Sequence, residues 1–153
     1  MSPEQLVLLG YAFPNLTPAN SRASSPPDPA YNCVAWARGI DTEWWWPDPE
    51  LQGFWPAGIP RIIDIPTFRL MFDSWGYTDT SADSVEPGVA KVAFFADARG
   101  TPTHVARQLP DGWWASKLGT DIDIEHALTA LEGPVYGTVA VIMARPVPSN
   151  STV

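Results

Sequence analysis

The stretch YNCVAWARG, residues 31–39, contains the only cysteine of the 153-residue chain, and the expected fold is organised around it. Asn32 is a good helix N-cap, so the spacing predicts a short helix over residues 33–38. Gly39 can end this helix in left-handed geometry. The thiol of Cys33 then lies on the first helical turn, where unpaired backbone N–H groups and the helix dipole favour a thiolate.

Downstream of this helix, a second helical segment is followed by extended segments. Asp64 can cap a second helix that Gly76 can end, with an apolar face at Phe68, Met71, Phe72 and Trp75. Turn signals at Pro87-Gly88 and Asp111-Gly112 separate the strands that we expect over residues 90–96, 103–109, 113–118 and 136–143. Helices followed by antiparallel strands predict an α+β fold.

Two further helical segments are expected near the ends of the chain. Residues 3–9 follow a capping serine, with proline at the first helical position. Acidic residues crowd a helix start near residue 121, and apolar residues at helical spacing precede Gly133. His126 then falls in the first turn of this helix, where a surface or capping role is expected.

We expect one domain over residues 1–153, long enough for a single core. Residues 1–30 form a Pro/Ser-rich arm, residues 41–63 a Trp/Pro-rich loop and residues 146–153 a tail. The chain has 17 Pro and 8 Trp, both well above the usual share, which favours stiff loops and aromatic clusters that either fill a loop-rich core or line a cleft.

The formal net charge of −8 argues against nucleic acid and anionic membranes as partners, because no basic patch exists to release counterions. One cysteine excludes an internal disulfide, and no signal peptide or membrane span is recognisable. We therefore expect a protein that is cytoplasmic, or exported without a classical signal. No cofactor is expected, since one Cys and two His would need carboxylates to complete a zinc site.

His104 is the residue expected to act as a base for Cys33. It begins a strand directly after a turn, so its ring is expected at a sheet edge that a helix N-terminus can meet. The alternatives stay open: Cys33 can be a small buried core residue, and His104 a polar residue at the start of a strand.

The residue that would orient His104 depends on the turn at Asp111-Gly112. A two-residue turn puts Lys117 on the face of His104, whereas a three-residue loop with a bulge puts Ser116 there. The backbone N–H of Cys33 is the first candidate for stabilising an oxyanion. The substrate-binding candidates are Tyr31, Asn32, Trp36, Trp45, Trp46 and Trp55.

These motifs resemble the NlpC/P60 family of papain-like cysteine hydrolases. Tyr31-Asn32-Cys33 is similar to the Tyr-Asp-Cys that opens the catalytic helix of that family. Pro87-Gly88 with Val92, Phe94 and Phe95 looks like its Pro-Gly-Asp-Leu-Val-Phe-Phe strand. His104-Val105 followed by Asp111-Gly112 looks like its His-Val strand and turn. The chain as a whole also looks like a family of small single-domain bacterial proteins.

The resemblance implies a papain-like fold in which Cys33 attacks an amide carbonyl and His104 is the base. The family often has His where the spacing puts Ser116, its Ser-Gly after the nucleophile is Val34-Ala35 here, and its Asp after Pro-Gly is Val89. The expected function is an amidase or peptidase acting on a peptide or other amide-containing substrate, and a toxin-like effector is one form that such an enzyme takes. Acyl transfer and deamidation share its first step. The alternatives are a catalytically degenerate papain-like domain that binds a peptide or protein partner, and a structural protein.

Overall fold

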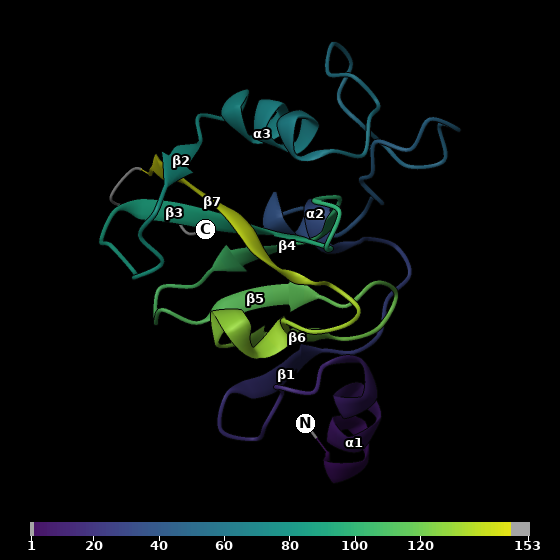
Figure 1. Ribbon diagram of the computed structural model, residues 1–153, viewed down its shortest axis with the longest axis vertical. Helices are drawn as coiled ribbons and strands as arrows, with labels where there is room; N and C mark the ends of the chain where they lie inside the picture. Colours follow the sequence, from purple (N-terminus) through teal and green to yellow (C-terminus); the bar gives the residue numbers. More distant parts are fainter. Residues whose placement is uncertain (1, 148–153) are drawn as a thin grey trace.

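Seven antiparallel strands form one sheet in the order β1-β6-β5-β4-β3-β7-β2 (Figure 1). The computed structural model describes residues 2–147. The expected α+β class with an antiparallel sheet is therefore confirmed. The strands are β1 (Ser21–Ser25), β2 (Thr78–Thr80), β3 (Val89–Ala96), β4 (Pro102–Gln108), β5 (Trp114–Lys117), β6 (Asp123–His126) and β7 (Thr138–Pro146).

Three α-helices form where the sequence predicts them, because each begins at a capping side chain. Ser2 and Gln5 make a capping box at α1 (Pro3–Ala12), Asn32 caps α2 (Cys33–Ala37), and Asp64 caps α3 (Ile65–Asp73). In the part of the chain that the structure describes, no helix has the length and hydropathy needed to cross a membrane.

The sheet has a hydrophobic cluster on each face, because side chains alternate along its strands. Val105 of β4 belongs to the cluster that contains Cys33 and the buried face of α3, which we call the α2-side cluster. Ala106, the next residue, belongs to the cluster that α1 packs against, which we call the α1-side cluster. Figure 1 shows α1 and α3 at opposite ends of the molecule.

The prediction of a helix near residue 121 is wrong. Residues 123–126 form β6, which pairs with β5 on one side and β1 on the other, and Leu128–Leu131 form a short 3-10 helix. The segment Asp121–His126 alternates apolar and polar residues, a period of two that matches a strand better than a helix. Ile124 and His126 are fully buried on the α1 side, and Asp123 is fully buried on the opposite face, where it accepts from Tyr31.

Both edges of the sheet contain a strand that the sequence does not predict. The arm over residues 1–30 contains α1, which the sequence predicts, and the edge strand β1, which it does not predict. An irregular stretch joins the two. β2 at the other edge is also unexpected. Most of the expected tail over residues 146–153 lies outside the described residues.

Candidate functional site

Cys33 is the first residue of α2, as expected, and its surroundings hold the thiol in its neutral form. The side chain of Asn32 accepts a hydrogen bond from the backbone N–H of Ala35, which begins the helix at Cys33. Cys33 is only 7% exposed. Burial raises the pKa of its thiol to about 11, although the nearby backbone N–H of Val105 and the charge of Lys117 act in the opposite direction.

His104 is fully buried on β4, and its ring lies among the aromatic residues of the α1-side cluster. It stacks on Tyr136 with ring centroids 4.1 Å apart and planes 7° from parallel, and it meets the ring of Phe95 at 5.3 Å. Phe95 is also the residue paired with His104 across the β3–β4 ladder. Burial lowers the pKa of His104 well below its usual value, so the ring is neutral.

Cys33 and His104 lie on opposite faces of the sheet. Val105 packs with Cys33, and strand alternation sends the preceding ring of His104 to the other face, beside Phe95 and Tyr136. Nδ1 of His104 has no hydrogen-bond partner within residues 2–147. Because the sulfur and the imidazole are not in contact, the catalytic roles stay a prediction that this geometry does not favour.

Three buried side chains form a hydrogen-bonded chain on the α1 side of the sheet. Nε2 of His104 lies 2.8 Å from Oγ of Ser116, and the same Oγ lies 2.7 Å from Nε2 of His126. Nδ1 of His126 lies 2.7 Å from the carbonyl oxygen of Ala127, which can only accept, so this nitrogen carries the proton. The hydroxyl of Ser116 therefore donates to neutral His126 and accepts from Nε2–H of His104.

The hairpin register decides between the two candidates for the partner of His104. Arg107 pairs with Ala115 and Gln108 with Trp114, which is the register of the three-residue loop. Ser116 therefore shares a face with His104, and Lys117 points to the other face. His126 was expected on a helix surface and instead completes a buried network, which is a correction to that expectation.

Lys117 takes part in a second buried polar group, on the α2 side of the sheet. Its ammonium donates to the carbonyl oxygens of Asp28 and Gly119, both at 2.6 Å, and lies 4.9 Å from the ring centre of Tyr31. The hydroxyl of Tyr31 donates to Oδ2 of Asp123 at 2.5 Å. These bonds tie the segment before α2 to β5 and β6, so both side chains have a positioning role in the fold.

Most of the expected substrate-binding residues are occupied by contacts within the domain. Asn32 donates to the carbonyl oxygen of Trp45 and accepts from its N–H, so its amide holds the Trp/Pro-rich loop. Trp45 and Trp55 are 6% and 5% exposed, respectively. The guanidinium of Arg107 covers the indole of Trp36 at 4.2 Å. Trp46, in contrast, lines an open pocket.

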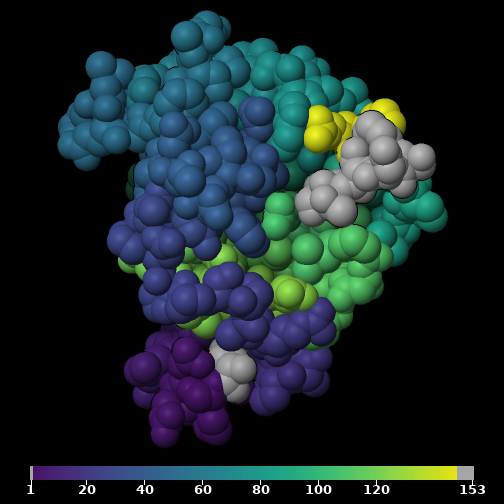
Figure 2. Space-filling view, turned by 180° about the vertical axis from the view of Figure 1, so that it is seen from behind, coloured from purple at the N-terminus to yellow at the C-terminus, as the bar shows by residue number. Residues whose placement is uncertain are grey.

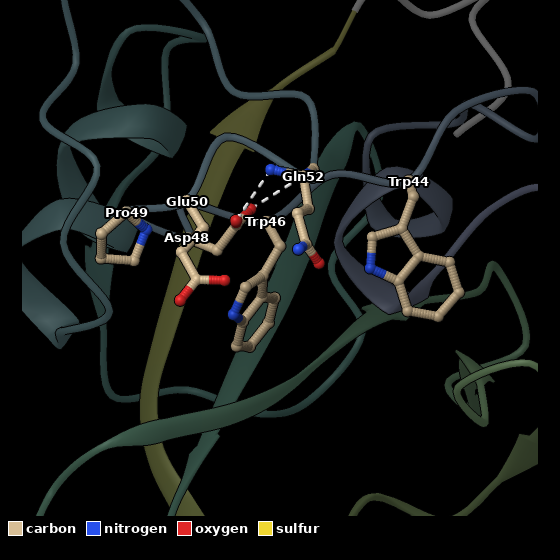
Figure 3. Close-up of a pocket in the computed structure, with 7 residues that line it drawn as sticks. Trp44, Trp46, Asp48, Pro49, Glu50 and Gln52 are labelled. Carbon is tan, nitrogen blue, oxygen red and sulfur yellow. Dashed lines mark hydrogen bonds between the residues drawn. The ribbon is translucent and has the colours of Figure 1, made fainter.

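That pocket lies on the Trp/Pro-rich loop and has a volume of about 550 Å³ (Figure 3). In Figure 2 the blue segment that carries the loop bulges from one end of the molecule. Trp44 is 36% exposed, whereas Trp46 is half-buried. The lining residues are Trp44, Trp46, Asp48, Pro49, Glu50, Gln52 and Gly53.

The pocket has a fixed frame, although it is built from a loop. The carboxylate of Asp48 accepts from the backbone N–H groups of Gln52 and Gly53 at 2.8 and 2.7 Å. Arg61 donates to the carbonyl oxygens of Asp48 and Gly53 and closes the loop from the other side. A side chain at Gly53 would meet the carbonyl oxygen of Trp46 at 2.9 Å, so only glycine allows this close approach.

A second pocket, of about 440 Å³, lies between α3 and the strands β2 and β7. Two of its charged side chains are paired with each other, because Arg69 contacts Asp79 at 3.2 Å. Within residues 2–147 no group of three His, Cys, Asp or Glu side chains is arranged to hold a metal ion.

The fold and the pocket define an α+β domain built on one antiparallel sheet, with buried polar groups on both faces and an open aromatic pocket on a loop. The chain belongs to the family described as Domain of unknown function (DUF7689), whose model matches residues 22–144. The match reaches every strand of the sheet at least in part and leaves α1 outside it. Comparison with curated proteins found no match, and comparison with solved structures found none either.

Proposed function

We propose that this domain binds a peptide segment of a partner protein, through the pocket on the Trp/Pro-rich loop. One observation carries the proposal: the pocket of about 550 Å³ exposes aromatic surface on a hydrogen-bonded frame, while Cys33 and His104 are both buried. Aromatic side chains are typical anchors of protein interfaces, because they bury a large area with few rotatable bonds. The proposal includes that the chain is a catalytically degenerate papain-like domain, related to NlpC/P60.

Selection from a displayed random peptide library on the immobilised domain tests this function. We expect the wild-type domain to enrich a consensus peptide, and Trp44→Ala to weaken its binding by roughly tenfold or more, as for an aromatic anchor. Tyr11→Ala is the matched control, since Tyr11 is an aromatic side chain, 81% exposed, on α1. No enriched consensus, or equal binding by Trp44→Ala, would contradict the proposal.

Amide hydrolysis is the second candidate function. It is supported by the position of Cys33 at the start of α2 and by the Ser116 contact of His104, which leaves Nδ1 of His104 free to accept a proton. Catalysis would require a rearrangement that brings the sulfur and the imidazole to one face of the sheet.

Alkylation of Cys33 separates the two functions. We expect iodoacetamide at pH 7 to modify the folded protein about two orders of magnitude more slowly than a free thiol, because burial raises the pKa to about 11 and covers the sulfur. The same protein in urea should react at the free-thiol rate. Rapid labelling at pH 6 that His104→Ala slows would instead support the hydrolase.

A further inference from the structure

We propose that the loop pocket recognises the basic side chain, Arg or Lys, of the partner peptide. This inference rests on the proposed function and names the chemical group that the pocket takes. Two tryptophans, Trp44 and Trp46, and two acidic residues, Asp48 and Glu50, line the pocket. An indole face and a carboxylate both attract a cation, and together they define its position.

The two carboxylates of the pocket have different roles. Asp48 is committed to the frame, because it accepts two backbone N–H bonds and lies 3.6 Å from the guanidinium of Arg61. These backbone bonds lower the pKa of Asp48, so it stays ionised. Glu50 is exposed and forms no ion pair within residues 2–147. It is therefore the charge that an incoming cation can use.

Arginine side chains of the same chain lie over the indole rings of several other tryptophans. Trp36, Trp45, Trp75 and Trp113 each lie under an arginine of the same chain, at 3.8 to 5.1 Å, whereas Trp55 and Trp114 are buried, 5% and 2% exposed, among other side chains. In the part of the chain that the structure describes, no cation lies over Trp44 or Trp46. Trp44 and Trp46 line the open pocket, and Trp44 is 36% exposed, so a cation of a partner can reach an indole there.

The overall charge favours the same partner. The chain carries a formal net charge of −8, which attracts a basic segment and speeds its encounter with the pocket. The same loop exposes the apolar side chains of Leu51 and Phe54, 69% and 45% exposed, which can contact apolar residues of a peptide next to its Arg or Lys. We therefore infer a peptide with Arg or Lys at its centre rather than a free small cation.

Titration of the full chain with capped amino acids tests this inference, followed through the indole N–H signals of Trp44 and Trp46 in NMR spectra. Nα-acetyl-arginine amide and Nα-acetyl-lysine amide should shift these signals with millimolar affinity. The neutral analogues, Nα-acetyl-citrulline amide and Nα-acetyl-norleucine amide, should not. Glu50→Gln should weaken binding of the cations by about fivefold, and added salt should weaken it further in the wild type.

Glu4→Gln is the matched control, because it removes the same charge from α1, at the other end of the molecule (Figures 1 and 2). Equal binding of the neutral and cationic amides, or an unchanged affinity in Glu50→Gln, would overturn the inference. If tetramethylammonium binds more tightly than Nα-acetyl-arginine amide and Nα-acetyl-lysine amide, the choice of a peptide over a free small cation is overturned. A selected consensus that depends on Trp44 but contains no basic residue would refute this inference and leave the proposed function intact.

Discussion

Replacing Ser116 with alanine is expected to lower the free energy of unfolding by about 2 to 5 kcal/mol, since it leaves two buried polar atoms without partners. The hydroxyl is the shared partner of Nε2 of His104 and Nε2 of His126, at 2.8 and 2.7 Å. All three side chains are fully buried. Solvent therefore cannot replace the lost bonds unless the cavity admits a water molecule.

Urea unfolding of the wild type and of Ser116→Ala measures this difference, with the m-value checked for two-state behaviour. Ser81→Ala is the matched control, because Ser81 is an exposed serine and its loss should change the free energy by less than about 0.5 kcal/mol. If Ser116→Ala is as stable as that control, the hydroxyl does not link the two imidazoles. The outcome also bears on function, since it measures a structural role for a residue that the sequence suggests as a catalytic partner.

Much of the fold is predictable from the sequence because the helix starts and the sheet hairpins have local signals. The side chains of Asn32 and Asp64 cap the helices that they are expected to cap, and the β3 to β5 segments follow their turn signals. β1 and β2 have no such signal. They become strands because β6 and β7 present free edges to them, which is a tertiary effect.

The candidate site is predicted less well, because its geometry depends on which face of the sheet each side chain takes. Spacing along the chain places Cys33 at a helix start and His104 on a strand, and both positions are found. The face of His104 depends on how β4 lies against α2, and this is a long-range property. The pairing with Ser116 was one of two alternatives, and only the register of the loop before β5 selects it.

The residues that sequence reasoning missed are those whose local pattern is ambiguous. His126 and Asp123 were placed in an expected helix by the acidic cluster around them, although alternation marks a strand. Trp44 and Glu50 were within the expected Trp/Pro-rich loop, yet nothing local distinguishes Trp44 from its buried neighbour Trp45. The bridge between Trp45 and Phe54 decides that one indole turns inward and the other outward.

The buried histidines should also make the domain sensitive to mild acid. Burial lowers the pKa of His126 to about 4, and burial also lowers the pKa of His104 well below its usual value of 6.5. In the folded protein His126 stays neutral down to about pH 4, and His104 stays neutral well below pH 6.5, whereas in the unfolded chain both take up a proton below about pH 6.5. The unfolded state then binds more protons, so stability falls as the pH decreases.

The expected loss of folding stability at low pH is therefore large. Each histidine contributes a slope of up to about 1.4 kcal/mol per pH unit below pH 6.5, and His126 alone contributes about 3 kcal/mol by pH 4. Urea unfolding at pH 7, 6, 5 and 4.5 measures the slope. Comparison within each variant removes any constant change in stability, so His126→Gln is informative even where it is less stable at pH 7.

His126→Gln should lose about half of the slope between pH 6.5 and 5, and His104→Gln a similar share, because glutamine does not titrate. Both retain the ionised Asp48, whose contribution disappears only at lower pH, since its pKa is lowered. Equal slopes in the wild type and in both variants would show that water reaches the imidazoles and that they protonate in the folded state. The buried hydrogen-bonded chain of His104, Ser116 and His126 would then be wrong.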